Sequence, residues 1–250
     1  MDAGQRERYL AAMGIQSWVP RGGEPDPGAA EPVAEPAAVA APAVLPPAQA
    51  SAAAVTRLDD LATLDWEALE ARVAGCNACG LHATRSRTVF GRGDRQAELM
   101  VVGDAPGEEE DARGEPFVGE AGHMLDTMLR AIGYGRGEVC IVNTLKCMTP
   151  ANREPHVDEL AACRQILMRQ IELVRPRLIL AVGRVAAHTL LGRDDKLAAL
   201  RGSVHTLPGS DLPVIATYHP AYLIRSPGEK RHSWQDLLRA RRELRTRAEG

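Results

Sequence analysis

Four of the five cysteines have the residue type and spacing of a metal-binding set. Cys76 and Cys79 form a C-x2-C pair, Cys147 lies far along the chain, and Cys163 follows it sixteen residues later. Two thiolates at the first spacing can hold one metal atom or two corners of one cluster. An all-thiolate zinc site and a cubane iron–sulfur cluster are both open on this pattern. Structural zinc sites favour a second short cysteine pair, which this chain lacks, so the spacing favours iron–sulfur.

The composition indicates in which compartment these thiols act. The chain has 250 residues, 45% of them hydrophobic and 25% charged, as in ordinary globular proteins. No apolar run reaches the roughly 18 residues needed to span a bilayer, and the segment MDAGQRERYL lacks the apolar core of a secretory signal. We therefore expect a cytoplasmic protein, in which cysteines indicate metal binding before disulfides. Cys140, inside an apolar run, is interpreted as a small buried hydrophobic residue.

Charge is distributed unevenly along the chain. The net charge is −3, yet residues 1–65 carry four Lys/Arg and nine Asp/Glu. The segment from Arg225 to Arg247 holds eight basic and three acidic residues. Basic charge gathered on one element is typical of phosphate binding. A solvated helix face has the same composition, so charge alone leaves both interpretations open.

Three regions follow one another in the sequence. Residues 1–19 combine a short helical pattern with the phrase GIQSWVPR. We favour a frayed terminus there over a tethered peptide that docks on a protein partner through Trp18. Residues 20–57 form an Ala/Pro-rich stretch, predicted to be a disordered linker because it cannot bury enough surface to offset chain entropy. Residues 58–250 are predicted to fold as the catalytic domain.

Short apolar runs alternate with helical patterns through this domain. The runs are rich in Val and Ile and bounded by turn residues, which is typical of buried strands. The alternation predicts an α/β fold, a three-layer sandwich with a central, mainly parallel four-stranded sheet flanked by helices. The predicted strands are 98–103, 139–145, 177–183 and 213–217, and the predicted helices lie near 119–132, 156–174 and 184–191.

Three of the predicted strands end in polar phrases punctuated by Gly and Pro. These are GDAPGEEED (103–111), NTLKCMTPANR (143–153) and YHPAYLIR (218–225). In open α/β sheets, ligands bind at the carboxyl ends of the strands. We therefore expect the three phrases to line one cleft.

These phrases, with GEPFVGEAG after the first and the cysteine sixteen positions after NTLKC, resemble the family-four, iron–sulfur type of uracil-DNA glycosylase. The resemblance runs from about Cys76 to about Arg241 and leaves residues 1–57 outside. It implies a uracil-DNA glycosylase-like fold and a monomer that acts on uracil in single- or double-stranded DNA at the start of base-excision repair. It also implies that the four cysteines hold a structural 4Fe–4S cluster.

The resemblance assigns roles to three residues near the reacting base. Phe117 matches the aromatic platform that stacks on the flipped base. Asn143 matches the amide that reads uracil, because one amide can donate to a carbonyl oxygen and accept from the ring N–H. His219 matches the histidine that stabilises the departing uracil anion by donating to its oxygen.

The first polar phrase departs from the family pattern. The family usually reads Gly-Glu-x-Pro-Gly, whereas this chain has Asp104, one methylene shorter, so its catalytic role in positioning water or stabilising the sugar cation is in question. Glu110 is expected to border the pocket and help exclude the thymine methyl group. Gly103 and Ala105 are expected to contact the base or its phosphate through backbone N–H groups.

A further set of residues is expected to contact DNA. A side chain after His219 is predicted to wedge into the gap left by the flipped base, with an arginine on phosphate. This set comprises Asn152, Tyr222, Leu223, Ile224 and Arg225.

Three alternatives remain beside this hypothesis. A DNA-binding or polymerase-associated module of the same fold with weak or lost activity is favoured by Asp104 and by the N-terminal extension. A zinc-stapled nucleic-acid binder is favoured by the cysteines alone. Covalent bonding to DNA through a histidine, as in a related branch, is disfavoured because no basic insertion lies between Asp111 and Phe117 and because His123 falls on a helical pattern.

Overall fold

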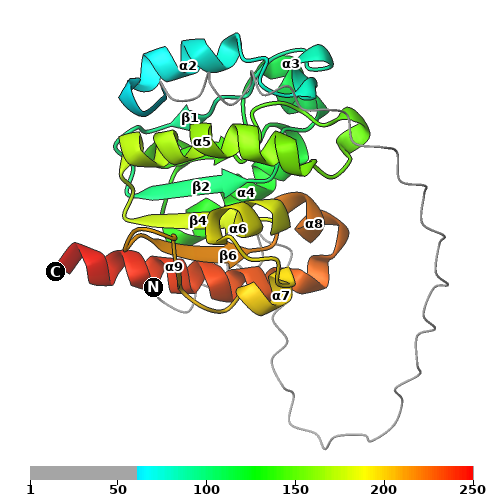
Figure 1. Ribbon diagram of the computed structural model, residues 1–250. Helices are drawn as coiled ribbons and strands as arrows, with labels where there is room; N and C mark the ends of the chain where they lie inside the picture. Colours follow the sequence, from blue (N-terminus) through cyan, green and yellow to red (C-terminus); the bar gives the residue numbers. More distant parts are fainter. Residues whose placement is uncertain (1–60, 250) are drawn as a thin grey trace, which may run out of the picture.

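A six-stranded sheet forms the centre of the computed structural model, which describes residues 61–249 (Figure 1). The predicted segments 1–19 and 20–57 lie outside the described residues. The strand order is β1-β3-β2-β4-β6-β5, and the four inner strands are parallel. The strands are β1 Arg92–Gly93, β2 Leu99–Gly103, β3 Cys140–Asn143, β4 Leu178–Val182, β5 His205–Thr206 and β6 Pro213–Thr217.

The inner strands confirm the predicted parallel sheet, but the expected number of four strands is wrong. Two more strands, β1 and β5, each two residues long, pair antiparallel with β3 and β6 at the two edges. A two-residue strand has no alternation of apolar and polar residues, so its sequence carries no strand signal. Every residue of the four inner strands is buried, which explains their continuous apolar runs.

Helices cover both faces of the sheet, as the alternating pattern predicts. Side chains of β4 alternate between the two layers: Ile179 and Ala181 pack with α2, α5, α6 and α7, whereas Leu180 packs with α4, α8 and α9. The helices of the first layer are α2 Trp66–Ala74, α5 Val157–Val174, α6 Arg184–Leu191 and α7 Leu197–Leu200, and those of the second are α4 Gly119–Ile132, α8 Pro220–Arg225 and α9 Lys230–Glu249. The remaining short helices are the α-helix α3 Glu108–Arg113 and the 3-10 helices η2 Leu61–Thr63, η3 Gly80–Ala83, η4 Arg136–Glu138, η5 Pro150–Asn152 and η6 Pro227–Glu229.

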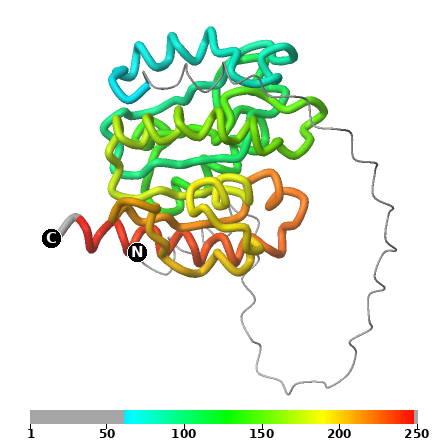
Figure 2. The backbone as a smooth tube through the Cα atoms, in the orientation of Figure 1, coloured from blue at the N-terminus to red at the C-terminus, as the bar shows by residue number. Residues whose placement is uncertain are grey.

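Strand order places a switch point between β2 and β4. The chain leaves β2 through α4 on one face and leaves β4 through α6 on the other, so the two connections diverge at neighbouring carboxyl ends (Figure 2). Such a divergence opens a crevice where open α/β sheets bind ligands. Asp104 follows β2 and Gly183 follows β4, so both lie at this crevice.

The basic C-terminal segment does not form one phosphate-binding face. Helix α9 runs from the cleft side toward the opposite end of the sheet, where the chain ends (Figure 1). There Arg241 and Arg245 border a hollow with Glu98, which precedes β2. Arg225 is the member of the segment that lines the cleft. Among the described residues, no helix is both long and apolar enough to cross a membrane.

Candidate active site and cysteine cavity

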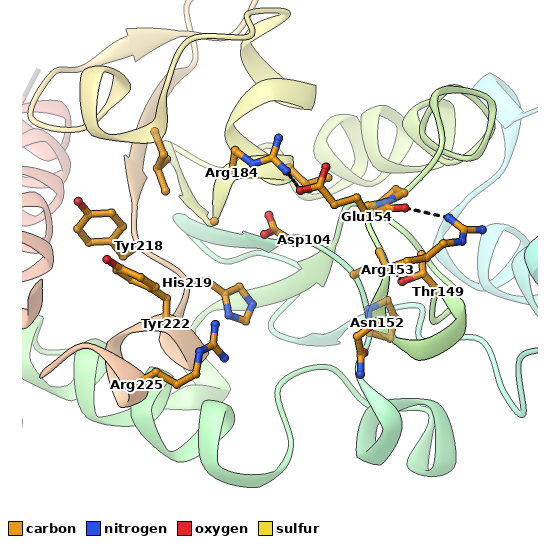
Figure 3. A pocket seen from close by; sticks show the side chains of 16 residues that line it. Asp104, Thr149, Asn152, Arg153, Glu154, Arg184, Tyr218, His219, Tyr222 and Arg225 are labelled. Carbon is orange, nitrogen blue, oxygen red and sulfur yellow. Dashed lines mark hydrogen bonds and ion pairs between the residues drawn. The ribbon is translucent and has the colours of Figure 1, made fainter. Parts of the chain in front are cut away.

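The three polar phrases line one cleft, as expected. A cavity of about 630 Å³ opens at the carboxyl ends of the strands and receives side chains from each phrase (Figure 3). Its lining includes Asp104 from the first phrase, Asn152 from the second, and His219 and Arg225 from the third. Residues more than a hundred positions apart in the sequence therefore share one site.

His219 is held as a neutral hydrogen-bond donor. It caps the N-terminus of α8, and its Nδ1 accepts a hydrogen bond from the backbone N–H of Ala221 at 3.2 Å. Burial, assisted by the nearby charge of Arg225, lowers the pKa of His219 to about 4. The ring is therefore neutral at pH 7 and carries its proton on Nε2, which is free to donate to a ligand.

Asn143 is held in one orientation by a carboxylate. Its Nδ2 donates to Glu110 Oε2 at 3.1 Å, and Glu110 Oε1 accepts from the backbone N–H of Phe117 at 2.7 Å. The Oδ1 atom of Asn143 is buried and has no hydrogen-bond partner among the described residues. A buried amide oxygen without a partner is costly, so it is an acceptor available to a ligand. The Oδ1 atom of the predicted reading amide is thus unpaired, although Asn143 and Glu110 are not among the residues that line the cleft.

Gly103 allows the aromatic ring and the amide to close on each other. A Cβ atom at Gly103 would lie 2.3 Å from Asn143 Oδ1 and 2.6 Å from Phe117 Cζ. The Phe117 ring stacks on the His219 ring at 5.5 Å between centroids and 27° between planes. Phe117 has a φ of 52°, a left-handed conformation that costs energy outside glycine and often marks functional sites.

Phe117 is more buried than its loop position in the sequence indicates. Its exposed fraction is 2%, and it packs with Leu125 and Leu223 in the hydrophobic layer below the sheet. Its ring belongs to the core and also stacks on His219, which lines the cleft.

Glu110 gives the site a pH dependence. Burial raises the pKa of Glu110 to about 7, against the hydrogen bonds from Phe117 and Asn143 that favour its charged form. We expect kcat/KM for uracil to rise with pH through about 7, because the ionised carboxylate is the stronger acceptor for both N–H groups. The free energy of unfolding changes in the opposite direction. Because the folded state holds a proton that the unfolded state releases, stability falls as pH rises from the ordinary pKa of 4.5 to the raised value of about 7.

The Glu110→Gln variant checks this expectation. Gln cannot ionise, so the rise near pH 7 should disappear, and kcat/KM at pH 8 should fall about tenfold because Asn143 loses its charged partner. The measurement is the pH profile of kcat/KM for wild type and variant between pH 5 and 9. A profile with the same inflection in both proteins would assign that inflection to another group.

Asp104 is tied to the start of α6. Its Oδ1 accepts a hydrogen bond from the backbone N–H of Ala186 at 2.7 Å. A Cβ at Gly183 would lie 2.3 Å from Asp104 Oδ2, so only glycine permits this approach. Burial raises the pKa of Asp104 to about 6, although the α6 backbone N–H groups oppose that shift. The shorter carboxylate therefore lines the cleft in a bonded position.

Two ion pairs beside the cleft escaped the sequence analysis. Arg184, the residue after Gly183, pairs with Glu154 across the mouth of the cleft (Figure 3). Arg153 pairs with Glu159 at 2.6 Å, which braces the loop that carries Asn152. The position of Arg184 in the sequence indicates such a role, because this residue follows the end of a strand as the three polar phrases do.

The expected DNA-contacting residues separate by burial. Tyr222 is 37% exposed and lines the cleft beside Arg225. Leu223 is fully buried in the core, so its expected contact with DNA is wrong. Ile224 is half-buried, which leaves Tyr222 and Ile224 as the candidates for the wedge. The residues differ in exposure because successive side chains on helix α8 point in different directions.

The four predicted metal-binding cysteines line one small cavity. Cys76 and Cys79 from the loop after α2 face Cys147 and Cys163, and none of the described cysteines forms a disulfide. Cys140 lies apart from this cavity, buried in β3, as interpreted from the sequence. The four thiols thus converge from three separate segments of the chain.

The donor set fits an iron–sulfur cluster. The cavity that the four cysteines line receives no histidine or carboxylate from the described part of the chain, and a cubane cluster takes one thiolate at each of four corners. Arg85 donates to Cys147 Sγ at 3.1 Å, the kind of hydrogen bond that surrounds cluster sulfurs. Burial raises the pKa of Cys163 to about 12, so this thiol ionises only with a cation beside it.

Fold and site together define a base-excising enzyme class, and the comparisons with known proteins agree. The model of the Uracil DNA glycosylase superfamily matches residues 90–238. The chain belongs to this superfamily and, within it, to the type-4 uracil-DNA glycosylases. It is 41% identical over 161 residues to the type-4 enzyme of Archaeoglobus fulgidus, covering 62% of this chain and 81% of the relative.

Two further relatives carry the same name. The type-4 uracil-DNA glycosylase of Pyrobaculum aerophilum is 37% identical over 180 residues, covering 70% of this chain and 92% of the relative. The type-4 uracil-DNA glycosylase of Thermotoga maritima is 41% identical over 162 residues, covering 64% of this chain and 83% of the relative. These matches confirm the family that the sequence motifs resemble.

Proposed function

We propose that the protein is a monofunctional uracil-DNA glycosylase that hydrolyses the N-glycosidic bond of a flipped-out uracil and so initiates base-excision repair. The observation that carries this proposal is the Asn143 amide, whose Nδ2 is bonded to Glu110 and whose buried Oδ1 is free. Uracil presents an N–H donor beside a carbonyl acceptor. Asn143 offers an acceptor and a second Nδ2 hydrogen in matching order.

This arrangement also rejects cytosine. Cytosine presents an acceptor and an amino group at the same edge, so it would face Asn143 with the reverse polarity. A free amide could rotate to suit it, but rotation here would turn Oδ1 toward Glu110, whose ionised carboxylate only accepts hydrogen bonds. Glu110 thus contributes to specificity by holding Asn143 in one orientation. This role differs from the exclusion of the thymine methyl group that the position of Glu110 in the motif implied.

The chemistry needs a stabilised leaving group and a positioned water. The neutral His219 ring would donate its Nε2–H to the uracil oxygen on which negative charge grows. Phe117, rigid and buried, would support the base. Asp104 would stabilise the sugar cation or orient water from the α6 side of the cleft, where the Ala186 N–H holds its carboxylate. Gly103 and Ala105 would form the wall behind the base.

Cys76, Cys79, Cys147 and Cys163 would hold a 4Fe–4S cluster. The group would be structural, since hydrolysis of this bond moves no electrons. We also infer a cytoplasmic monomer.

An oligonucleotide assay tests the proposed activity. A single uracil in single- or double-stranded DNA should be released, and alkali should then cleave the abasic strand. Matched oligonucleotides with cytosine or thymine at that position serve as controls and should stay intact. An uncleaved uracil strand at high enzyme concentration, with uracil-specific binding retained, would favour instead a module of the same fold with lost activity.

The cleft-mouth ion pair predicts a change in the salt dependence of DNA binding. We expect Arg184 to exchange Glu154 for a phosphate, so Arg184→Gln should reduce the slope of log K against log salt by about 0.9, the value of one phosphate contact. Glu154→Gln should tighten binding, because it frees Arg184. The measurement is the Kd of a uracil-containing duplex at several salt concentrations.

The control for this prediction is Arg193→Gln. Arg193 also forms an exposed ion pair, with Asp195, but lies beyond the C-terminal end of α6 and away from the cleft. Its slope should equal that of the wild type. An equal slope for Arg184→Gln would remove Arg184 from the DNA-binding surface.

A further inference from the structure

Lys146 is a fully buried lysine that contacts both the cysteine cavity and the base-reading residue. It is 1% exposed, and its Nζ donates to the backbone carbonyl of Asn143 at 2.6 Å. Its side chain lines the cavity together with Cys147 and Cys163. Lysines are almost never buried to this degree unless their charge is paired.

The acidic groups that face the ammonium are thiols. Those of Cys147 and Cys163 line the cavity beside it, and the carbonyl of Asn143 accepts its hydrogen bond. Four thiolates around a cubane cluster leave a net negative charge in the cavity. A buried cation and a buried anion that lie side by side stabilise each other, whereas either charge alone is costly to bury.

We infer that Lys146 is a positioning residue that transmits the presence of the cluster to uracil recognition. Its side chain lies between the cysteine cavity and the main chain, and the bond from its Nζ to the carbonyl of Asn143 fixes that residue at the end of β3. Asn143 is then held twice, by Glu110 at its side chain and by Lys146 at its carbonyl. The inference rests on the proposed glycosylase function and on the proposed cluster.

Lys146→Met tests this link, since Met fills a similar volume without charge or donor. In cluster-loaded protein we expect kcat/KM for uracil to fall about 10-fold to 100-fold, because a misplacement of ~1 Å can cost about 10²-fold in rate. The Kd for undamaged DNA should not change. The reduction potential of the cluster should become more negative, since loss of a neighbouring cation disfavours the added electron.

Arg169→Met is the matched control. Arg169 also donates to a backbone carbonyl, that of Leu64, from the same helix as Cys163, but it lies outside the cavity. This variant should keep the wild-type potential and kcat/KM. A loaded Lys146→Met protein with wild-type potential and wild-type kcat/KM would overturn the inference.

If Lys146→Met does not fold or does not bind the cluster, lysine labelling of the wild-type protein tests the link between Lys146 and the cluster. The chain has three lysines, Lys146, Lys196 and Lys230, and Lys196 is exposed. In loaded wild-type protein, an acetylating reagent should modify Lys196 and spare Lys146; removal of the cluster by oxidation and chelation should make Lys146 reactive. Equal labelling of Lys146 and Lys196 in the loaded protein would overturn the inference. An inactive wild-type protein would instead overturn the proposed function, while labelling and potential still report on Lys146.

Discussion

Replacing His219 with alanine is expected to lower kcat for uracil release about 10²–10³-fold, the usual cost of one donor aimed at a developing anion. The structure gives the reason: Nδ1 is occupied by the Ala221 N–H, and burial keeps the ring neutral, so Nε2–H is a fixed donor. The loss should appear mainly in kcat, because the donor bonds most strongly to the charge that forms in the transition state. Single-turnover kinetics on a uracil oligonucleotide measure it.

His123→Ala is the control for this prediction. His123 is exposed on α4 and is the residue that a covalent mechanism through a histidine would need. The variant should release uracil at the wild-type rate and form no cross-link to DNA. A His219→Ala protein within a factor of about three of wild type would mean that the leaving group is stabilised elsewhere.

Replacing Cys147 with serine is expected to remove the cluster and the activity together. Serine lacks the thiolate that a cluster corner requires, and Cys147 lies four residues after Asn143 on the strand exit that places the reading amide. We expect loss of the iron and of its visible absorption, and a fall in kcat/KM of at least about 10²-fold, since the amide is no longer held in place. Iron analysis and the oligonucleotide assay measure both.

Cys140→Ala provides the comparison. Cys140 is as deeply buried as Cys147 but lies in β3 outside the cavity, so its loss should cost about 1 kcal/mol of stability and leave the iron content unchanged. A stable, fully active Cys147→Ser protein would separate the cluster from catalysis. A colourless wild-type protein with stoichiometric zinc after anaerobic preparation would exclude the cluster itself.

The strands, the position of the cleft and the set of cysteines could be predicted from local sequence pattern. Continuous apolar runs located β2, β3, β4 and β6, because a strand covered on both faces is apolar throughout. The polar phrases after these strands located the cleft, because parallel strands bring their carboxyl ends to one edge. The spacing of the cysteines indicated one centre, and the motifs identified the family.

Tertiary structure decided what depends on contacts between distant residues. The bond from Asn143 to Glu110 joins residues 33 apart, and that from Ala186 to Asp104 joins residues 82 apart. Neither pairing leaves a mark in the local sequence. Burial in the same packing lowers the pKa of His219 and raises that of Glu110, because desolvation acts only once the chain has folded around them.

The burial and the contacts of single side chains also depend on the tertiary structure. Leu223 and Tyr222 are neighbours in one phrase, yet the orientation of α8 buries the first and exposes the second. Lys146 reads in the sequence as an ordinary charged residue beside a cysteine, and only the fold places its ammonium against Asn143. The spacing of residues along the chain thus predicted which residues belong to the site. Their hydrogen-bond partners, their protonation states and the orientation of their side chains depend on tertiary packing.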